Sequence, residues 1–267
     1  MKFKTNDTFF HAGYQGVVLA PVMTEGVFSG RYDVGWGPAN LPMRLKEEWM
    51  FLEDGDQADK HTYSFNTQDK PNVIICDDFY SDPDSVRALA LEQEYFGDLR
   101  YHKGERTKNK YLFPWVKEKI ESILGAKIPE WTKHGYNGVF QYCPADTPIV
   151  YHADVQSYAA VVYLTPNAPY EAGTSLFASK KIKGYRRPAS VEDGLTKDEA
   201  NGINDLIFSG NLLDKTAWEL VDVIGNVYNR LAIWDAKMIH SASTYEGLVS
   251  EIVDKARMVQ LFFFTVK

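Results

Sequence analysis

The chain has 267 residues, 45% of them hydrophobic, and a formal net charge of −7. This composition is globular and excludes a disordered or collagen-like chain. The acidic balance argues against a general nucleic-acid or anionic-membrane binder, although a local basic patch leaves nucleic acid open. No apolar run approaches the roughly 20 residues that span a bilayer.

The N-terminal residues and the cysteines indicate the cellular compartment of the protein. The N-terminal residues lack the apolar core and cleavage site of a signal peptide. Cys76 and Cys143 are the two cysteines, too few for a disulfide scaffold or a thiolate zinc site. We therefore expect a reduced cytoplasmic protein with no membrane partner.

Residues 1–70 show no clean hydrophobic period and are rich in aromatic, glycine and turn residues. We predict an irregular N-terminal extension with short strands, packed on the core. Residues 71–267 have sharper patterns and are predicted to form the main domain.

The main domain is predicted to begin with a strand at 73–76 and two helices. Asp82 and Pro83 are typical of a helix start, and an apolar stripe over 111–124 followed by Gly125 predicts a second helix and its end.

The rest of the chain is strand-like, with one helical insertion. Thr196 and Glu199 have the spacing of a capping box, which predicts the helix there. Gly225-Asn226 predicts a hairpin between two strands. The expected strands are 138–142, 149–152, 158–165, 174–178, 217–224, 227–234 and 257–266. The fold class is therefore mainly β with flanking helices, as a β-sandwich or jelly-roll.

The candidate metal ligands are His152, Asp154 and, 86 positions after the aspartate, His240. Residues i and i+2 of a strand point to one face, so His152 and Asp154 can bind one ion. A distant second histidine completes the two-histidine, one-carboxylate set of non-haem Fe(II) oxygenases. The tripeptide alone also fits a structural histidine followed by a turn aspartate.

Arg257 opens a terminal strand that is apolar on both faces. A buried guanidinium needs an anionic partner. The sequence leaves two partners open, a structural carboxylate or a dicarboxylate cosubstrate that the guanidinium binds in a bidentate way.

In this order of motifs the sequence resembles the Fe(II)/2-oxoglutarate-dependent dioxygenases, closest to the prolyl-hydroxylase-like branch and to oxygenases of bacteria and phages. The resemblance covers roughly residues 72–267 and includes Gly104-Glu105-Arg106-Thr107. It implies a double-stranded β-helix (jelly-roll, cupin-like) core.

The resemblance also implies a function for the site. His152, Asp154 and His240 would bind Fe(II) and form the catalytic centre, and O2 would react there. Arg257 and Tyr142 would bind the cosubstrate 2-oxoglutarate, which yields succinate and CO2 as an unidentified primary substrate is hydroxylated. The separation of His240 and Arg257 is longer than in many members, which leaves Arg230 as a competitor.

Two other functions stay open: a jelly-roll metalloenzyme without 2-oxoglutarate, and a non-catalytic binding module. The basic stretch Lys180–Arg187 is predicted to be a solvated loop, with a lip for an anionic substrate as the alternative. For Arg106 we expect a salt bridge rather than a substrate contact. Oligomeric state and the role of residues 1–70 are not predicted.

Overall fold

The computed structural model describes residues 8–11, 14–24, 27–36, 41–46, 73–97, 104–182, 184–189, 193–248 and 256–267. The chain divides into two compact units. One contains residues 1–66, 178–211 and 216–219; the other contains 67–177, 212–215 and 220–267. The helical insertion therefore groups with the N-terminal residues, although the sequence placed it in the main domain.

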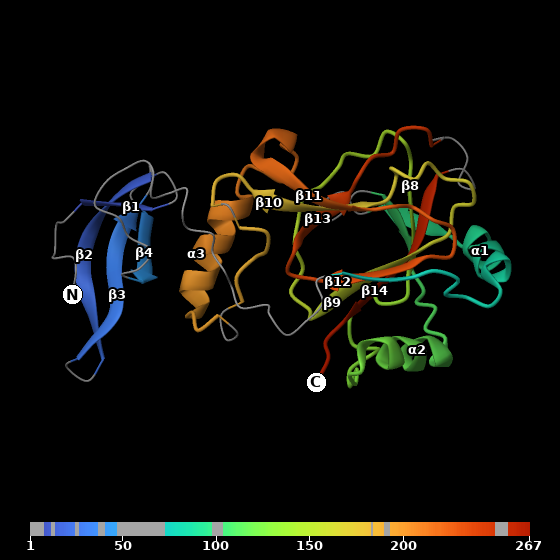
Figure 1. The fold of residues 1–267 in the computed structure, drawn as a ribbon, viewed down its shortest axis with the longest axis horizontal. Helices are drawn as coiled ribbons and strands as arrows, with labels where there is room; N and C mark the ends of the chain where they lie inside the picture. The colour runs from blue at the N-terminus through green and yellow to red at the C-terminus, as the bar shows by residue number, and fades with distance from the viewer. Residues whose placement is uncertain are drawn as a thin grey trace. The chain divides into compact units, whose positions relative to one another are not determined.

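The first unit contains an antiparallel sheet in the order β1-β2-β3-β4 (Figure 1). Its strands are β1 Thr8–His11, β2 Tyr14–Thr24, β3 Val27–Trp36 and β4 Leu41–Lys46. β2 and β3 pair over most of their length, with register shifts between Val18 and Ala20 and between Pro21 and Met23. The same unit contains α3, Lys197–Phe208, and both hydrogen bonds of the predicted capping box between Thr196 and Glu199 are present.

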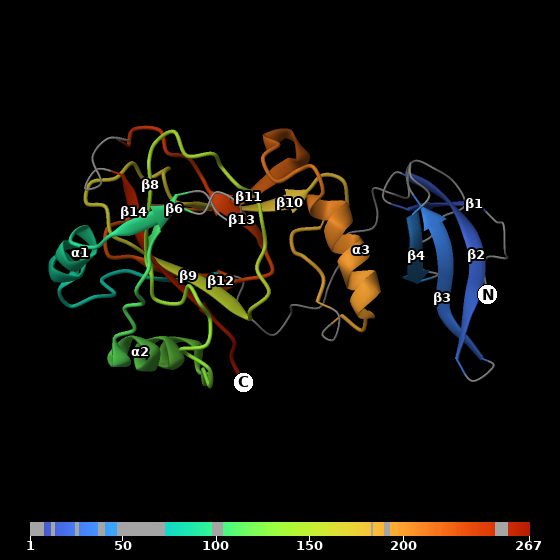
Figure 2. The same cartoon turned by 180° about the vertical axis from the view of Figure 1, so that it is seen from behind.

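Apart from the last two residues of β10 and the first two of β11, the second unit contains the remaining strands, which form two antiparallel sheets (Figures 1 and 2). The larger has the order β5-β12-β9-β14-β8-β7-β6, and the smaller has the order β11-β10-β13. The larger sheet comprises β5 Val73–Cys76, β6 Tyr95–Gly97, β7 Glu105–Thr107, β8 Phe140–Cys143, β9 Tyr158–Tyr163, β12 Leu231–Asp235 and β14 Arg257–Phe264. The smaller comprises β10 Thr174–Ser179, β11 Trp218–Ile224 and β13 Ile239–Ala242. The predicted mainly β jelly-roll class is confirmed.

Two local predictions were wrong. The strand expected at 149–152 is reduced to a single bridge between His152 and His240. Gly225-Asn226 is not a hairpin turn, because β11 and β12 belong to different sheets. There Asn226 donates to the carbonyls of Tyr170 and Ala172, so the turn residues connect the two sheets instead of pairing neighbouring strands.

Helix α1, Pro83–Leu91, begins at the predicted cap, and α2, Pro114–Leu124, begins three residues later than predicted and ends where predicted. The Asp82 side chain accepts from the Ser85 amide, and Gly125 ends α2 with a left-handed φ of 62°. Among the described residues, no helix is long and apolar enough to cross a membrane.

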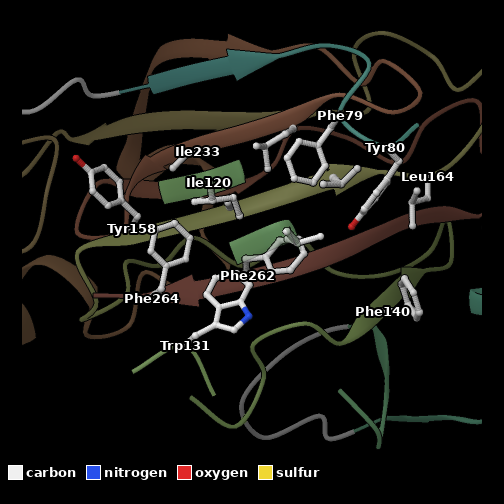
Figure 3. Close-up of a cluster of buried hydrophobic side chains, with 14 of the residues drawn as sticks. Phe79, Tyr80, Ile120, Trp131, Phe140, Tyr158, Leu164, Ile233, Phe262 and Phe264 are labelled. Atoms are coloured by element: carbon white, nitrogen blue, oxygen red, sulfur yellow. The ribbon is translucent and has the colours of Figure 1, made fainter. Parts of the chain in front are cut away.

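The hydrophobic core lies between these helices and one face of the larger sheet (Figure 3). From β14 it contains Met258, Phe262 and Phe264, which have the same parity on the strand. Arg257 and Val259 have the opposite parity and are also buried, so β14 is buried on both faces as predicted. The second face of the larger sheet lies against the smaller sheet, where the candidate site is found.

Candidate metal centre

The two histidines and the aspartate of the predicted triad lie together. Their ligand atoms are all within 4.8 Å of one another. His152 and His240 are paired through both backbone hydrogen bonds, at 3.1 and 2.8 Å, and the Asp154 amide donates to the Ala236 carbonyl at 2.7 Å. Backbone pairing between segments about 86 residues apart therefore sets the positions of all three side chains.

Both imidazole rings are held in the tautomer that suits a metal ligand. Nδ1 of His152 donates to the Val150 carbonyl at 2.9 Å, and Nδ1 of His240 donates to the Met238 carbonyl at 2.8 Å. Since a carbonyl only accepts, each Nδ1 carries the proton. Each Nε2 is left with a lone pair for a cation, as in histidine metal sites whose other nitrogen is hydrogen-bonded.

The Asp154 carboxylate has a buried oxygen, Oδ2, with no hydrogen-bond partner. It lies 3.5 Å from Nε2 of His240. Burial lowers the pKa of His240 to about 4, assisted by His152 and opposed by Asp154. His240 is therefore neutral at pH 7, so two acceptors face each other with no proton between them. A cation between these groups would satisfy both, so the donor set fits a metal.

One wall beside the triad is aromatic. The Trp234 ring from β12 packs edge-on against His240, with ring centroids 5.1 Å apart. Trp234 is buried. This wall keeps water away from one side of the histidine and fixes its ring, as supporting groups do around a metal ligand.

Arg257 is buried and has no carboxylate partner among the described residues. Its Nε donates to the Ala172 carbonyl at 3.0 Å, and Nη2 approaches the Gly173 carbonyl and the Thr174 hydroxyl at 3.2 and 3.3 Å. The guanidinium lies 5.4 Å from the centroid of the Tyr163 ring. Neutral partners leave the positive charge of Arg257 uncompensated in a buried position.

Gly173 is required where it contacts the smaller sheet. A Cβ there would lie 1.8 Å from the carbonyl oxygen of Ile224, so no other residue fits without moving the backbone. The Gly173 carbonyl faces Arg257, so this close approach also positions an acceptor for the guanidinium.

Arg230, the competitor for Arg257, has a structural partner. Its Nε and Nη2 bond the two carboxylate oxygens of Asp77 at 2.6 and 2.9 Å. This pairing raises the pKa of Arg230. Asp77 therefore already supplies the anionic partner of the Arg230 guanidinium.

The structure does not bring Tyr142 together with Arg257. Tyr142 is opposite Met258 in the β8–β14 register, whereas Arg257 is opposite Cys143, so the two side chains leave opposite faces of the sheet. Tyr142 packs against Tyr95, and burial and a hydrogen bond with Glu105 raise its pKa to about 12.

Tyr163 is the tyrosine that lies beside Arg257, and sequence reasoning missed it. Its buried hydroxyl donates to Thr174 at 2.8 Å. Burial raises its pKa. All residues of β9 are buried, so no pattern along this strand singled out Tyr163, and the pairing with β14 was needed to place it next to an arginine.

The basic stretch is not uniformly solvated. Arg186 is 2% exposed and forms a bidentate pair with Asp193 within the first unit, at 2.6 and 3.2 Å. Lys180 is exposed. Arg186 therefore corrects the prediction of a solvated loop at one position, because an aspartate outside the stretch neutralises it.

No protein-family model and no curated protein matches the chain. Among solved structures, a prolyl-4-hydroxylase of Pseudomonas putida is 13% identical, with a TM-score of 0.37, and 73% of this chain and 93% of that chain are covered.

HygX of Streptomyces hygroscopicus is similar in two crystal structures. Both are 11% identical, with 74% of this chain and 84% of that chain covered. The TM-score is 0.40 for HygX with nickel, 2-oxoglutarate and hygromycin B bound, and 0.41 for HygX with nickel and 2-oxoglutarate.

Proposed function

We propose that this protein is an Fe(II)- and 2-oxoglutarate-dependent oxygenase that hydroxylates a primary substrate. The observation that carries this proposal is the convergence of His152, Asp154 and His240, with an unpartnered carboxylate oxygen facing a neutral imidazole. Two histidines and one carboxylate bind a divalent metal on one face and leave adjacent positions for other ligands.

Arg257 supports 2-oxoglutarate as the second ligand of the site. Its guanidinium is buried, has only neutral partners among the described residues and lies on the sheet face that meets the smaller sheet. A dicarboxylate would supply the missing negative charge through a bidentate contact. Thr174 lines the same position and would donate to that carboxylate, while the Tyr163 hydroxyl donates to Thr174.

The protein side chains then have separate tasks. The triad would hold the metal, Arg257 would orient the cosubstrate by its distal carboxylate, and Trp234 would keep water from one side of His240. When bound, iron and 2-oxoglutarate supply the oxidative chemistry that side chains lack.

Metal and 2-oxoglutarate titrations of protein purified without oxygen test the proposal. Wild type should bind one equivalent of Mn(II) or Fe(II), and His152→Ala, Asp154→Ala and His240→Ala should each bind at least about 100-fold more weakly, because each removes a direct ligand. Asp222→Asn, at an exposed carboxylate on β11, should bind like wild type.

The same titrations separate the alternatives. Stoichiometric metal without any effect of 2-oxoglutarate would indicate a metalloenzyme that binds its substrate directly. Unchanged metal affinity in all three triad variants would refute the site and favour a non-catalytic binding module.

A further inference from the structure

Arg106 shares a sheet face with Arg257. In the larger sheet Arg106 of β7 lies opposite Gln141 of β8, and Gln141 lies opposite Val259 of β14. Val259 and Arg257 have the same parity on β14, and residues directly opposite in register leave the same face. Two arginines therefore point from β7 and β14 to the face that carries the candidate site.

Among the residues that the structure describes, Arg106 has neutral partners only. Its Nε donates to Oε1 of Gln141 at 2.5 Å, and its guanidinium carbon lies 4.7 Å from the ring centroid of Tyr136. In the part of the chain that the structure describes, no carboxylate lies within ion-pair distance of Arg106, and its two Nη groups donate to no residue. The expected salt bridge was therefore wrong, since β7 places this guanidinium among neutral groups.

The guanidinium also lies within the electrostatic range of the metal centre. Burial lowers the pKa of Arg106, and Asp154, Tyr136 and Cys143 oppose that shift. His134 interacts with both Asp154 and Arg106. A bound divalent cation would neutralise Asp154, so the charge of Arg106 would face the metal with no counter-charge from the residues that the structure describes.

We propose that Arg106, supported by Gln141 and Tyr136, binds an anionic group of the primary substrate and so presents that substrate to the metal. This inference rests on the proposed function and adds a substrate class to it: molecules that carry a carboxylate or a phosphate. The planar guanidinium fork matches both anions, and the Tyr136 ring holds the guanidinium plane in place.

Two probe anions test the proposal in full-length protein with bound Mn(II) and saturating 2-oxoglutarate, which occupies Arg257. Paramagnetic relaxation of acetate protons and of inorganic phosphate ³¹P reports anions held near the metal. Wild type should bind acetate, phosphate or both, and the preferred probe tells a carboxylate substrate from a phosphorylated one. Arg106→Gln should weaken that binding about tenfold or more, and Arg106→Lys less, because lysine keeps the charge without the fork.

Arg230→Gln is the matched control, because Arg230 is already paired with Asp77. It should retain probe binding, and Mn(II) affinity should be unchanged in Arg106→Gln. Probe binding that survives in Arg106→Gln would overturn the proposal. A loss of Mn(II) affinity with unchanged probe binding would instead make Arg106 a positioning residue for Asp154, which also overturns it.

Labelling of arginines with phenylglyoxal tests the same site without variants or metal. Arg106 should react faster than the ion-paired Arg186 and Arg230, and acetate or phosphate should protect it in peptide mass maps. If wild type binds no Mn(II), the proposed function fails while this labelling still decides the anion site. Labelling of Arg106 that neither anion slows would refute the anion site.

Discussion

Arg257 and Arg230 carry the same charge in opposite surroundings. Arg230 bonds both oxygens of Asp77, whereas Arg257 is 4% exposed and contacts carbonyls, a hydroxyl and an aromatic ring. A buried guanidinium without an anion is costly, so Arg257 is the residue whose surroundings call for an anionic ligand.

Arg257→Gln should raise the 2-oxoglutarate requirement by about two to four decades, because losing a buried bidentate ion pair removes about 3–5 kcal/mol. Metal binding should persist in this variant. Arg257→Lys should recover only part of the affinity, since lysine lacks the fork. The measurement is succinate formation against 2-oxoglutarate concentration.

Arg230→Gln is the control for that measurement. It breaks the Asp77 pair and should leave the 2-oxoglutarate requirement near the wild-type value. If Arg230→Gln raised the 2-oxoglutarate requirement and Arg257→Gln did not, the assignment of the cosubstrate to Arg257 would be wrong.

Among the elements, α2 has an acidic anchor at its C-terminal end. Glu121 accepts from the Ile128 amide at 2.8 Å and pairs with Lys127 and Lys117 at 2.9 and 3.1 Å. These contacts, the Ile128 hydrogen bond first, lower the pKa of Glu121 to about 2. The charged carboxylate therefore ties the end of the helix to the loop that follows it.

The stabilisation by Glu121 should depend on pH in a definite direction. Its folded pKa of about 2 lies below the ordinary value of 4.5, so its stabilisation is full above pH 4.5 and is lost as pH falls towards 2. Glu121→Gln should thus lower Tm at pH 7, and the difference from wild type should shrink between about pH 5 and 2. Thermal unfolding over this range is the measurement, and a Tm difference independent of pH would contradict the assignment.

At the scale of the whole molecule, the core of the second unit joins its helices to the larger sheet. Phe262 is fully buried on β14 and stacks on Trp131, with ring centroids 5.6 Å apart. Figure 3 shows both side chains within the cluster that also contains Ile120 of α2. Stability of this unit therefore depends on contacts between segments far apart in sequence.

Phe262→Ala should lower the free energy of unfolding of this unit by about 3–5 kcal/mol, because it removes a buried aromatic ring and leaves a cavity. Phe96→Ala is the matched control: Phe96 is 53% exposed, so its removal should cost less than about 1 kcal/mol. Urea unfolding of both variants gives the comparison. Equal losses would show that the buried cluster is not the core of this unit.

Features that depend on neighbouring residues could be predicted from the sequence. The caps at Asp82, Thr196 and Gly125 were confirmed, because each involves contacts within a few positions along the chain. The two-residue spacing of His152 and Asp154 indicated a shared ligand role, and the structure brings His240 to both. Capping is local, so spacing is enough to predict it. His152 and Asp154 come together without the strand expected at 149–152, because His152 forms a single bridge with His240.

Only the tertiary structure decided how strands far apart in sequence pair. Strand register places Tyr142 on the sheet face away from Arg257. It places Tyr163 on the same face as Arg257, and no local pattern in the sequence contains this difference. Strand pairing also gives Arg106 neutral neighbours. The partners of a charged side chain come from segments that meet only in the folded chain. The sequence therefore indicated candidate ligands and charged residues, and the fold determined which of them lie together.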